Sequence, residues 1–220
     1  IGNRMIAGYS GQAREIILQG ALPSQVDQAL VRFGMPMGPF QMADMVGLDL
    51  GWRAAKMRGE GIDDQPDSGK IPFQLCEMER FGQKNGKGFY LYEEGSRVPR
   101  PDPEVEALII SMSKEMGYNR REIDDDEVLK RIVYALVNIG AQLLDDKIAL
   151  RPGDIDIVYI NGYGFPAYRG GPMHYADEIG VKNVYDDICA FQAEYGDFWK
   201  PAPLLKRLAE EGKSFASLQA

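Results

Sequence analysis

His174 is the residue best suited to proton transfer near neutral pH, and it is the only histidine among the 220 residues. Histidine often acts as a general acid or base because its ordinary pKa lies close to physiological pH. No carboxylate at a motif-like spacing accompanies it, and Gln41 takes the matching place in a similar stretch nearer the N-terminus. We therefore predict that His174 is not catalytic and that this chain holds no catalytic set of its own.

Two glycine-rich strings could bind phosphate groups. GYGFPA at residues 162–167 fits the loose dinucleotide fingerprint G-x-G-x-x-A, which requires a strand before it and a helix after it. The preceding DIDIVYIN matches a helical segment earlier in the chain, and Pro166 interrupts the position where the next helix would start. GQKNGKG at residues 82–88 is one residue short of a phosphate loop and lacks the Ser or Thr that would reach Mg²⁺. We predict that neither string binds a nucleotide.

One short stretch is rich in flexible apolar side chains, namely Met35, Met37, Phe40, Met42 and Met45. Their helical spacing favours packing in a core. The alternative is an adaptable wall against a chain-like ligand, because methionine fills irregular gaps well. The residues alone leave both interpretations open.

The composition limits the classes of function. The formal net charge is −8, from 25 Lys and Arg against 33 Asp and Glu, and no basic cluster is large enough for a nucleic-acid binder. Cys76 and Cys189 lack the spacing of a disulfide framework or a zinc site, so we predict no metal site. No apolar run approaches the length of about 18 residues that a membrane span needs.

The elements that position these residues are predicted to be helices, because apolar residues recur at helical spacing in nearly every segment. Proline in the first turn and glycine just past the end accompany this pattern. A run of alternating strands is missing, so we predict an all-α fold. The expected helices cover residues 4–18, 23–33, 39–45, 49–56, 72–81, 102–116 and 124–146, and three more start at Pro152, Pro172 and Pro203.

Local sequence signals add helix caps, loops and a turn to this pattern of helices. Asp49 and Asp124 are predicted N-caps, the second within a capping box that ends at Glu127. The polar, glycine-rich residues 59–71 predict a loop, and KNGKGFYLY at residues 84–92 predicts a turn into a short extended segment. The following GSRVPRPDP is the best candidate for a linker.

The chain contains an internal repeat. GMPMGPFQMADMVG, which starts at Gly34, returns in altered form as GFPAYRGGPMHYADEIG, which starts at Gly164. Arg4 matches Arg131 in the same alignment, VDQAL matches IDIVY, and the Ala-Asp pair of each string matches the other. The order of the matches is kept, which favours duplication over two unrelated helical bundles that merely share a use of proline and glycine.

We therefore predict two tandem helical repeats that pack as a pseudo-dimer, because each unit is small and two copies could bury their apolar faces on one another. The predicted parts are a first repeat at residues 1–95, a linker and connecting helix at residues 96–119, and a second repeat at residues 120–220.

The strings GNRM, FGMPMGPFQMADMVGLD, NGKGFYLY and RPGDIDIVYINGYGFPAYRGGPMHYAD resemble the C-terminal region of L-3-hydroxyacyl-CoA dehydrogenase. The paired copies resemble the multifunctional fatty-acid β-oxidation proteins, in which this region occurs in tandem. The resemblance covers nearly the whole chain. It implies a helical domain that closes over acyl-CoA, while NAD and a catalytic His–Glu pair belong to an N-terminal nucleotide-binding domain. This sequence opens without Met at the start of the family's helical region, so we expect a fragment of a longer enzyme.

The resemblance also implies substrate-binding residues. Asn3 is the Asn of the family's N-R-[LM] motif, near the thioester end of the substrate, where it could polarise or position the acyl carbonyl. Without the resemblance, an Asn at a helix start is most often a cap. Met37, Pro39 and Phe40 of the G-x-P-M-G-P-F pattern are the other expected substrate contacts. The second copy has Lys130 in place of Asn3, so only the first copy keeps this part of the motif.

These implications predict the substrate-binding and assembly domain of an NAD-dependent enzyme that is inactive alone. Its expected partners are acyl-CoA and its own nucleotide-binding domain, its expected state is a monomer, and its expected compartment is the cytoplasm, or the peroxisome of a eukaryote. One rival hypothesis is a helical interaction module without chemistry. Another is the helical cap of a different NAD-linked dehydrogenase, such as one that acts on sugar acids.

Overall fold

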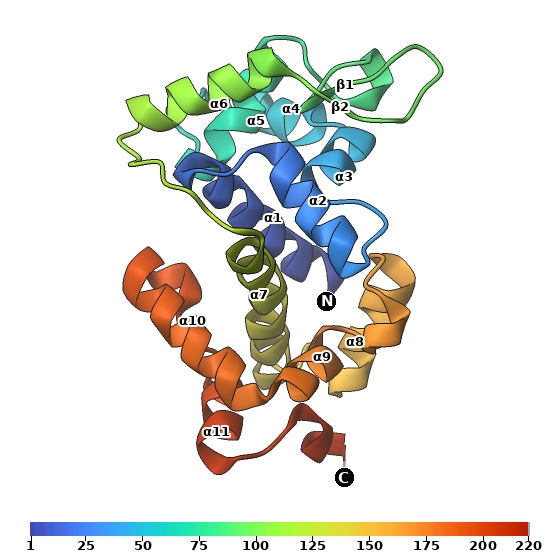
Figure 1. Cartoon of the computed structure of the whole chain (residues 1–220), viewed down its shortest axis with the longest axis vertical. Coiled ribbons are helices and arrows are strands. Elements are labelled where there is room, and N and C mark those ends of the chain that lie inside the picture. The colour runs from blue at the N-terminus through green and yellow to red at the C-terminus, as the bar shows by residue number, and fades with distance from the viewer. Residues whose placement is uncertain (220) are drawn as a thin grey trace. The chain divides into compact units, whose positions relative to one another are not determined.

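The computed structural model describes residues 1–219, which are mostly helical, as predicted (Figure 1). The helices are α1 (Gly2–Gln19), α2 (Pro23–Phe33), α3 (Pro39–Val46), α4 (Asp49–Met57), α5 (Asp67–Glu77), α6 (Pro103–Glu115), α7 (Asp125–Asp145), α8 (Pro152–Gly162), α9 (Pro172–Ile179), α10 (Val181–Tyr195) and α11 (Pro203–Glu211). The strands of these described residues are β1 (Tyr90–Leu91) and β2 (Arg100–Pro101), which pair antiparallel.

The chain divides into two compact units. The first unit consists of residues 10–129, and the second unit combines residues 1–9 with the chain from residue 130 onward. The divisions fall inside α1 and α7, so each of these two helices contributes residues to both units. Residues 96–119, the predicted linker and connecting helix, belong to the first unit.

Proline and glycine set the helix limits as the sequence predicts. Pro23 and Pro39 stand in the first turns of α2 and α3, where a missing backbone N–H costs no helical hydrogen bond. Gly34 ends α2 with a φ of 116°, a left-handed conformation that glycine adopts without the strain of a Cβ. The predicted cap at the start of α7 is confirmed, because the Asp124 carboxylate accepts the backbone N–H of Glu127 at 2.8 Å.

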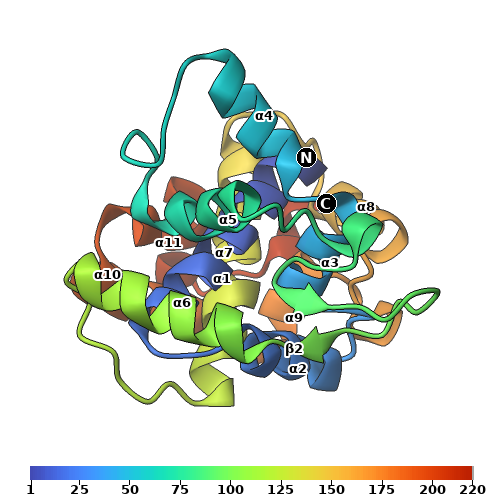
Figure 2. The ribbon, with the colours of Figure 1, turned by 90° about the horizontal axis from the view of Figure 1, so that it is seen from above.

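The expected limits of the fifth helix were wrong. The sequence predicts a helix over residues 72–81, but α5 begins at Asp67 and ends at Glu77, so Pro72 lies inside the helix. Four apolar side chains of this helix are buried around that proline, and their burial offsets the hydrogen bond that proline removes. They are Ile71, Phe73, Leu75 and Cys76. Figure 2 shows the wide loop that the chain makes between α4 and α5.

The predicted cap at Asp49 was also wrong. Leu48 occupies the cap position of α4, and Asp49 is the first residue of the helix. The Asp49 carboxylate accepts a hydrogen bond from Arg53 Nε at 2.8 Å and forms an ion pair with Lys84. The carboxylate therefore joins α4 to the segment before β1 and leaves the helix start without a side-chain cap.

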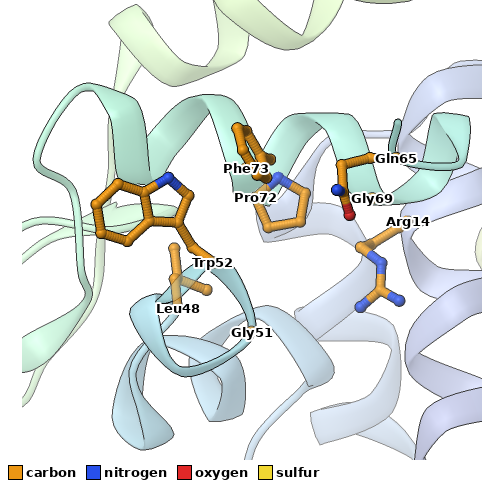
Figure 3. Close-up of a pocket in the computed structure, with 8 residues that line it drawn as sticks. All are labelled: Arg14, Leu48, Gly51, Trp52, Gln65, Gly69, Pro72 and Phe73. Atoms are coloured by element: carbon orange, nitrogen blue, oxygen red, sulfur yellow. The ribbon is translucent and has the colours of Figure 1, made fainter. Parts of the chain in front are cut away.

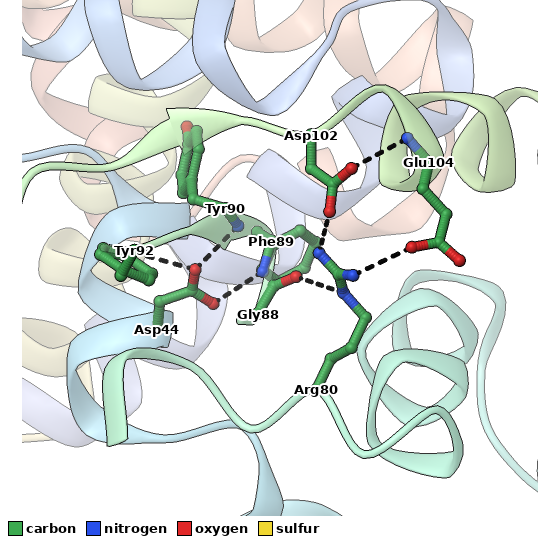
Figure 4. A network of polar contacts seen from close by, with 8 residues as sticks. All are labelled: Asp44, Arg80, Gly88, Phe89, Tyr90, Tyr92, Asp102 and Glu104. Carbon is green, nitrogen blue, oxygen red and sulfur yellow. Dashed lines mark hydrogen bonds and ion pairs between the residues drawn. The ribbon is translucent and has the colours of Figure 1, made fainter. Parts of the chain in front are cut away.

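The candidate linker is folded onto the first unit at its C-terminal end. Arg100 and Pro101 form β2, and Asp102 caps α6 by accepting the backbone N–H of Glu104 at 3.0 Å. Asp102 also forms a buried ion pair with Arg80, whose Nε donates to the Gly88 carbonyl at 2.9 Å (Figure 4). These contacts tie the C-terminal part of the candidate linker to the first unit.

Candidate functional site

Asn3 lies in the first turn of α1 with its side chain exposed, between two neighbours that fix this end of the helix. A Cβ on Gly2 would lie 2.0 Å from the hydroxyl oxygen of Tyr163, so a larger residue there would require the Tyr163 side chain to move. Arg4 forms an ion pair of 2.7 Å with Asp146 at the end of α7. The two neighbours hold the helix start, and the Asn3 side chain stays accessible.

The counterpart of this motif in the second repeat is built differently. Lys130 forms an ion pair of 3.4 Å with Asp187, and Arg131 is buried with its guanidinium carbon 4.1 Å from the centre of the Tyr195 ring. The exposed Asn–Arg pair of the first repeat is thus replaced by a salt-bridged Lys and a core Arg.

Met37, Pro39 and Phe40 lie together at the turn between α2 and α3. Met37 is half-buried, whereas Pro39 and Phe40 are buried. The Phe40 ring packs against Phe89 with 4.7 Å between ring centres. The methionine-rich stretch contributes to both core and surface, because Met35 is buried and Met45 is 50% exposed. Asn3 belongs to the second unit and these three residues to the first.

A buried carboxylate on α2 determines where α3 starts. Asp27 accepts the backbone N–H groups of Phe40 at 3.0 Å and Gln41 at 2.8 Å, and the Tyr90 hydroxyl donates to it at 2.7 Å. A Cβ on Gly38 would lie 2.2 Å from Asp27 Oδ1, so the glycine permits this close approach. Burial raises the pKa of Asp27 to about 6, against the lowering effect of the three hydrogen bonds.

A second buried carboxylate, Asp44 on α3, holds the segment that enters β1. It accepts the backbone N–H groups of Phe89 at 2.9 Å and Tyr90 at 3.0 Å, and the Tyr92 hydroxyl donates to it at 3.0 Å (Figure 4). Burial raises the pKa of Asp44 to about 6 as well, although its hydrogen bonds and the charge of Arg80 act in the other direction. Asp44 therefore links α3 to the β1 segment.

The second repeat contains the same two carboxylates. Asp156 on α8 accepts the backbone N–H of Met173 at 2.7 Å, at the start of α9, and burial raises its pKa to about 6. Asp177 on α9 accepts the backbone N–H groups of Phe215 at 2.7 Å and Ala216 at 2.9 Å. The aspartates of VDQAL, IDIVY and the two Ala-Asp pairs thus have matching roles, which the repeat alignment could have revealed.

His174 has an exposed side chain with Glu178 as a neighbour at 3.9 Å, one helical turn away. A shallow surface hollow of about 210 Å³ includes both, together with Tyr168, Arg169 and Tyr175. Cys76 and Cys189 are free thiols. Within residues 1–219, no group of three His, Cys, Asp or Glu residues could hold a metal ion.

The residues of the loose dinucleotide fingerprint do not fit NAD. Gly162 is the last residue of α8, so a helix stands where the fingerprint requires a strand. Pro166 is followed by a single 3-10 turn at Ala167–Arg169, where the fingerprint requires a long helix. The string therefore lacks the two elements that the fingerprint requires. Among the described residues, no helix is long and apolar enough to cross a membrane.

A cavity of about 280 Å³ lies within the first unit, between α1, α4 and α5. Its walls combine apolar side chains with Arg14 and Gln65, and Figure 3 shows Trp52, Pro72 and Phe73 on one side and Arg14 of α1 on another. None of the substrate contacts expected from the sequence lines it. No local pattern predicts this cavity, because its residues come from three segments that only folding brings together.

Comparison with known proteins identifies the family. The family model described as 3-hydroxyacyl-CoA dehydrogenase, C-terminal domain, matches residues 1–92 and 128–216. The chain is 41% identical to the peroxisomal bifunctional enzyme of Danio rerio over 226 residues, which cover 96% of this chain and 32% of that protein. It is 35% identical to the fatty acid oxidation complex subunit alpha of Shewanella sp. (strain MR-4), with 97% of this chain and 30% of that protein covered.

A solved structure agrees with these relatives. The dehydrogenase part of multifunctional enzyme 1 from C. elegans superposes with a TM-score of 0.73 at 28% identity, over 93% of this chain and 46% of that one. The chain spans about a third of the length of the curated relatives it matches. It belongs to the family of 3-hydroxyacyl-CoA dehydrogenase C-terminal domains.

Proposed function

We propose that this chain is the acyl-CoA-binding and assembly domain of an NAD-dependent L-3-hydroxyacyl-CoA dehydrogenase of fatty-acid β-oxidation. The family match over two long stretches of the chain carries this proposal. The names of the relatives support it, since they are a peroxisomal bifunctional enzyme and a subunit of a fatty acid oxidation complex. The compartment we propose is the cytoplasm, or the peroxisome in a eukaryote.

Within this function, Asn3 acts on the substrate. Its exposed side chain, at a helix start fixed by Gly2 and Arg4, can donate a hydrogen bond to the acyl carbonyl. Met37 is the accessible member of the other expected contacts, since Pro39 and Phe40 are buried. We assign Met37 to direct contact with the acyl chain, and Pro39 and Phe40 to the support of its loop.

Among residues 1–219, the loose dinucleotide fingerprint falls on a helix end, where it does not fit a nucleotide. The His174 side chain is exposed and has the exposed Glu178 as its neighbour at 3.9 Å. We therefore propose that a nucleotide-binding domain of the family supplies NAD and the catalytic pair, and that the 220 residues alone are inactive.

A direct assay tests this proposal. The chain alone and the chain joined to a nucleotide-binding domain of the family are each given a 3-hydroxyacyl-CoA and NAD, and NADH formation is followed. We expect activity only in the joined protein. Turnover that rises with the concentration of the chain alone would contradict the proposal, and so would a joined, folded protein that binds NAD but does not turn over.

We further propose that the two repeats replace the two subunits of a twofold dimer. Contacts between the repeats within each compact unit support this. In the second unit, Arg4 of the first repeat donates to Asp146 of the second at 2.7 Å, and a Cβ on Gly8 would lie 2.0 Å from Ile139 Cδ1. The start of α1 thus packs closely on the helix of the other repeat.

In the first unit, the start of the second repeat contacts the first repeat. Gln25 of the first repeat donates to the Ile123 carbonyl of the second at 2.7 Å, and Arg32 forms an ion pair with Asp125. The leading segment of each repeat therefore belongs to the unit formed mainly by the other repeat. Such reciprocal exchange is expected of two copies that pack through the same surface.

A further inference from the structure

The cavity between α1, α4 and α5 has the composition of a ligand site. Leu48, Trp52, Pro72 and Phe73 give it apolar and aromatic walls, and its volume is about 280 Å³ (Figure 3). Because a water molecule takes up roughly 30 Å³, the space suits a ligand of about ten heavy atoms or fewer. A small apolar pocket with one well-placed polar group is typical of small-molecule sites.

The charged group of this cavity is the Arg14 guanidinium, and the Gln65 amide is a second polar group of its lining. Among residues 1–219, Arg14 forms no hydrogen bond or ion pair, and its Nε is fully buried without a partner. Burial lowers the pKa of Arg14, although the charge of Glu15 acts in the other direction. Arg14 is half-buried, and the burial of its Nε is costly because that N–H has lost water and gained no acceptor.

The other cations near the cavity already have partners. Lys56 lies 5.1 Å from the Phe73 ring centre and forms an ion pair of 2.5 Å with Glu77. Lys70 forms an ion pair of 2.8 Å with Asp67. Neither lines the cavity. A single available positive charge between apolar walls selects a monoanion with an apolar body over inorganic phosphate, whose second charge would stay uncompensated.

We propose that this cavity binds a small organic carboxylate, such as a short-chain fatty acid, with the carboxylate paired to Arg14 and the apolar body between Trp52 and Phe73. The planar guanidinium can form two parallel hydrogen bonds to a carboxylate. The site is separate from the substrate contacts, none of which lines it, and its occupancy does not depend on the proposed dehydrogenase role.

Calorimetric titration of the 220-residue chain with hexanoate tests the proposal, with hexanol and inorganic phosphate as matched probes. We expect saturable binding of hexanoate and binding at least tenfold weaker for each of the other two, because hexanol lacks the charge and phosphate lacks the apolar body. The proposal is overturned if hexanoate does not bind, or if either control binds as tightly.

Variants then locate the site. Arg14→Met should weaken hexanoate binding at least tenfold, and Arg97→Met, at an exposed arginine in the turn between β1 and β2, should leave it unchanged. If circular dichroism shows that Arg14→Met does not fold, Gly51→Leu replaces it as the test variant. Gly51 lines the cavity, and a Cβ at this position would meet no atom within 4 Å. Gly51→Leu keeps Arg14 and should also weaken binding at least tenfold. Undiminished binding in either folded variant rules out this cavity.

Discussion

At the scale of single residues, the exposed Asn3 and its two fixed neighbours give the sharpest prediction about activity. In the chain joined to a nucleotide-binding domain, Asn3→Ala should lower kcat/KM by roughly 10- to 1000-fold, the range for loss of one positioned donor. Unfolding temperature should change little, because the side chain is exposed. The measurements are initial rates and thermal unfolding, with Asn161→Ala as the control at another exposed asparagine. Unchanged activity with a lower unfolding temperature would make Asn3 a structural residue only.

The buried aspartates predict a pH dependence of stability. The pKa of Asp27 rises from 3.8 to about 6 on folding, so the folded state holds its proton more tightly than the unfolded state. The resulting stability is fully present below pH 3.8 and is lost as the pH rises through about 6, on the order of 3 kcal/mol in total. Asp156 shares this direction.

Urea unfolding at about pH 5 and pH 7 measures this effect. The stability advantage of the parent over Asp27→Asn should shrink as the pH rises, since the variant has no carboxyl to titrate. Asp146→Asn is the control, because its exposed carboxylate has a pKa lowered by Gln142 and Arg4, and its contribution is lost only as the pH falls. Equal pH slopes in the parent and Asp27→Asn would show that the Asp27 carboxyl does not titrate in this range.

Arg14, the residue proposed to pair with the ligand, also affects the stability of the ligand-free protein. Arg14→Met removes a desolvated charge without a partner, and replaces it with a side chain of similar length that suits the apolar cavity. We expect the unfolding temperature of the ligand-free protein to rise, by roughly 2–4 °C for each kcal/mol gained in a chain of this size. Thermal unfolding without added carboxylate measures it. A fall in unfolding temperature would mean that the cation supports the fold.

At the scale of elements, the buried pair of Arg80 and Asp102 is the connection that holds β2 and α6 to the first unit. Arg80→Met leaves Asp102 buried without its partner, which should cost about 3–5 kcal/mol of unfolding free energy. Arg100→Met is the matched control, because its partner Glu93 and Arg100 itself are both more than 60% exposed, and such pairs contribute less than about 1 kcal/mol. Urea unfolding compares the two, and similar costs would contradict the assigned role of the buried pair.

Most elements could be predicted from local signals, because Pro23, Pro39 and Asp124 each act within one helical turn. The predicted start of α5 at about residue 72 was wrong, since burial of the residues around Pro72 outweighs the local cost of a proline inside a helix. The residues of the candidate site also divide into those that a local motif predicts and those that depend on long-range contacts. The motif identified Asn3, whereas the cavity around Arg14 depends on contacts between distant segments that have no periodicity.

At the scale of the whole molecule, duplication explains why so many features occur in pairs. Asp27 and Asp156 each fix the start of a short helix, and Asp44 and Asp177 each hold an aromatic segment near the end of their repeat. The first residues of each repeat also belong to the unit that is formed mainly by the other repeat. Neither repeat is therefore expected to be stable alone, because each would lose close contacts such as that of Gly8 with Ile139.

The oligomeric state follows from this exchange. In the proposed arrangement, the surface that one copy would present to a second subunit is covered by the other repeat of the same chain, at the high effective concentration that a short connection provides. We therefore predict a monomer, and light scattering coupled to size-exclusion chromatography at micromolar concentration should give a mass near 24.5 kDa. Arg4→Glu, which places a negative charge against Asp146, should loosen the contact between the repeats and lower the unfolding temperature. Arg53→Glu, at an exposed arginine of α4 that pairs within its own helix, is the control for the charge change. A dimer that persists on dilution would show that the repeats do not cover each other's dimer surfaces, and the duplication would then need another explanation.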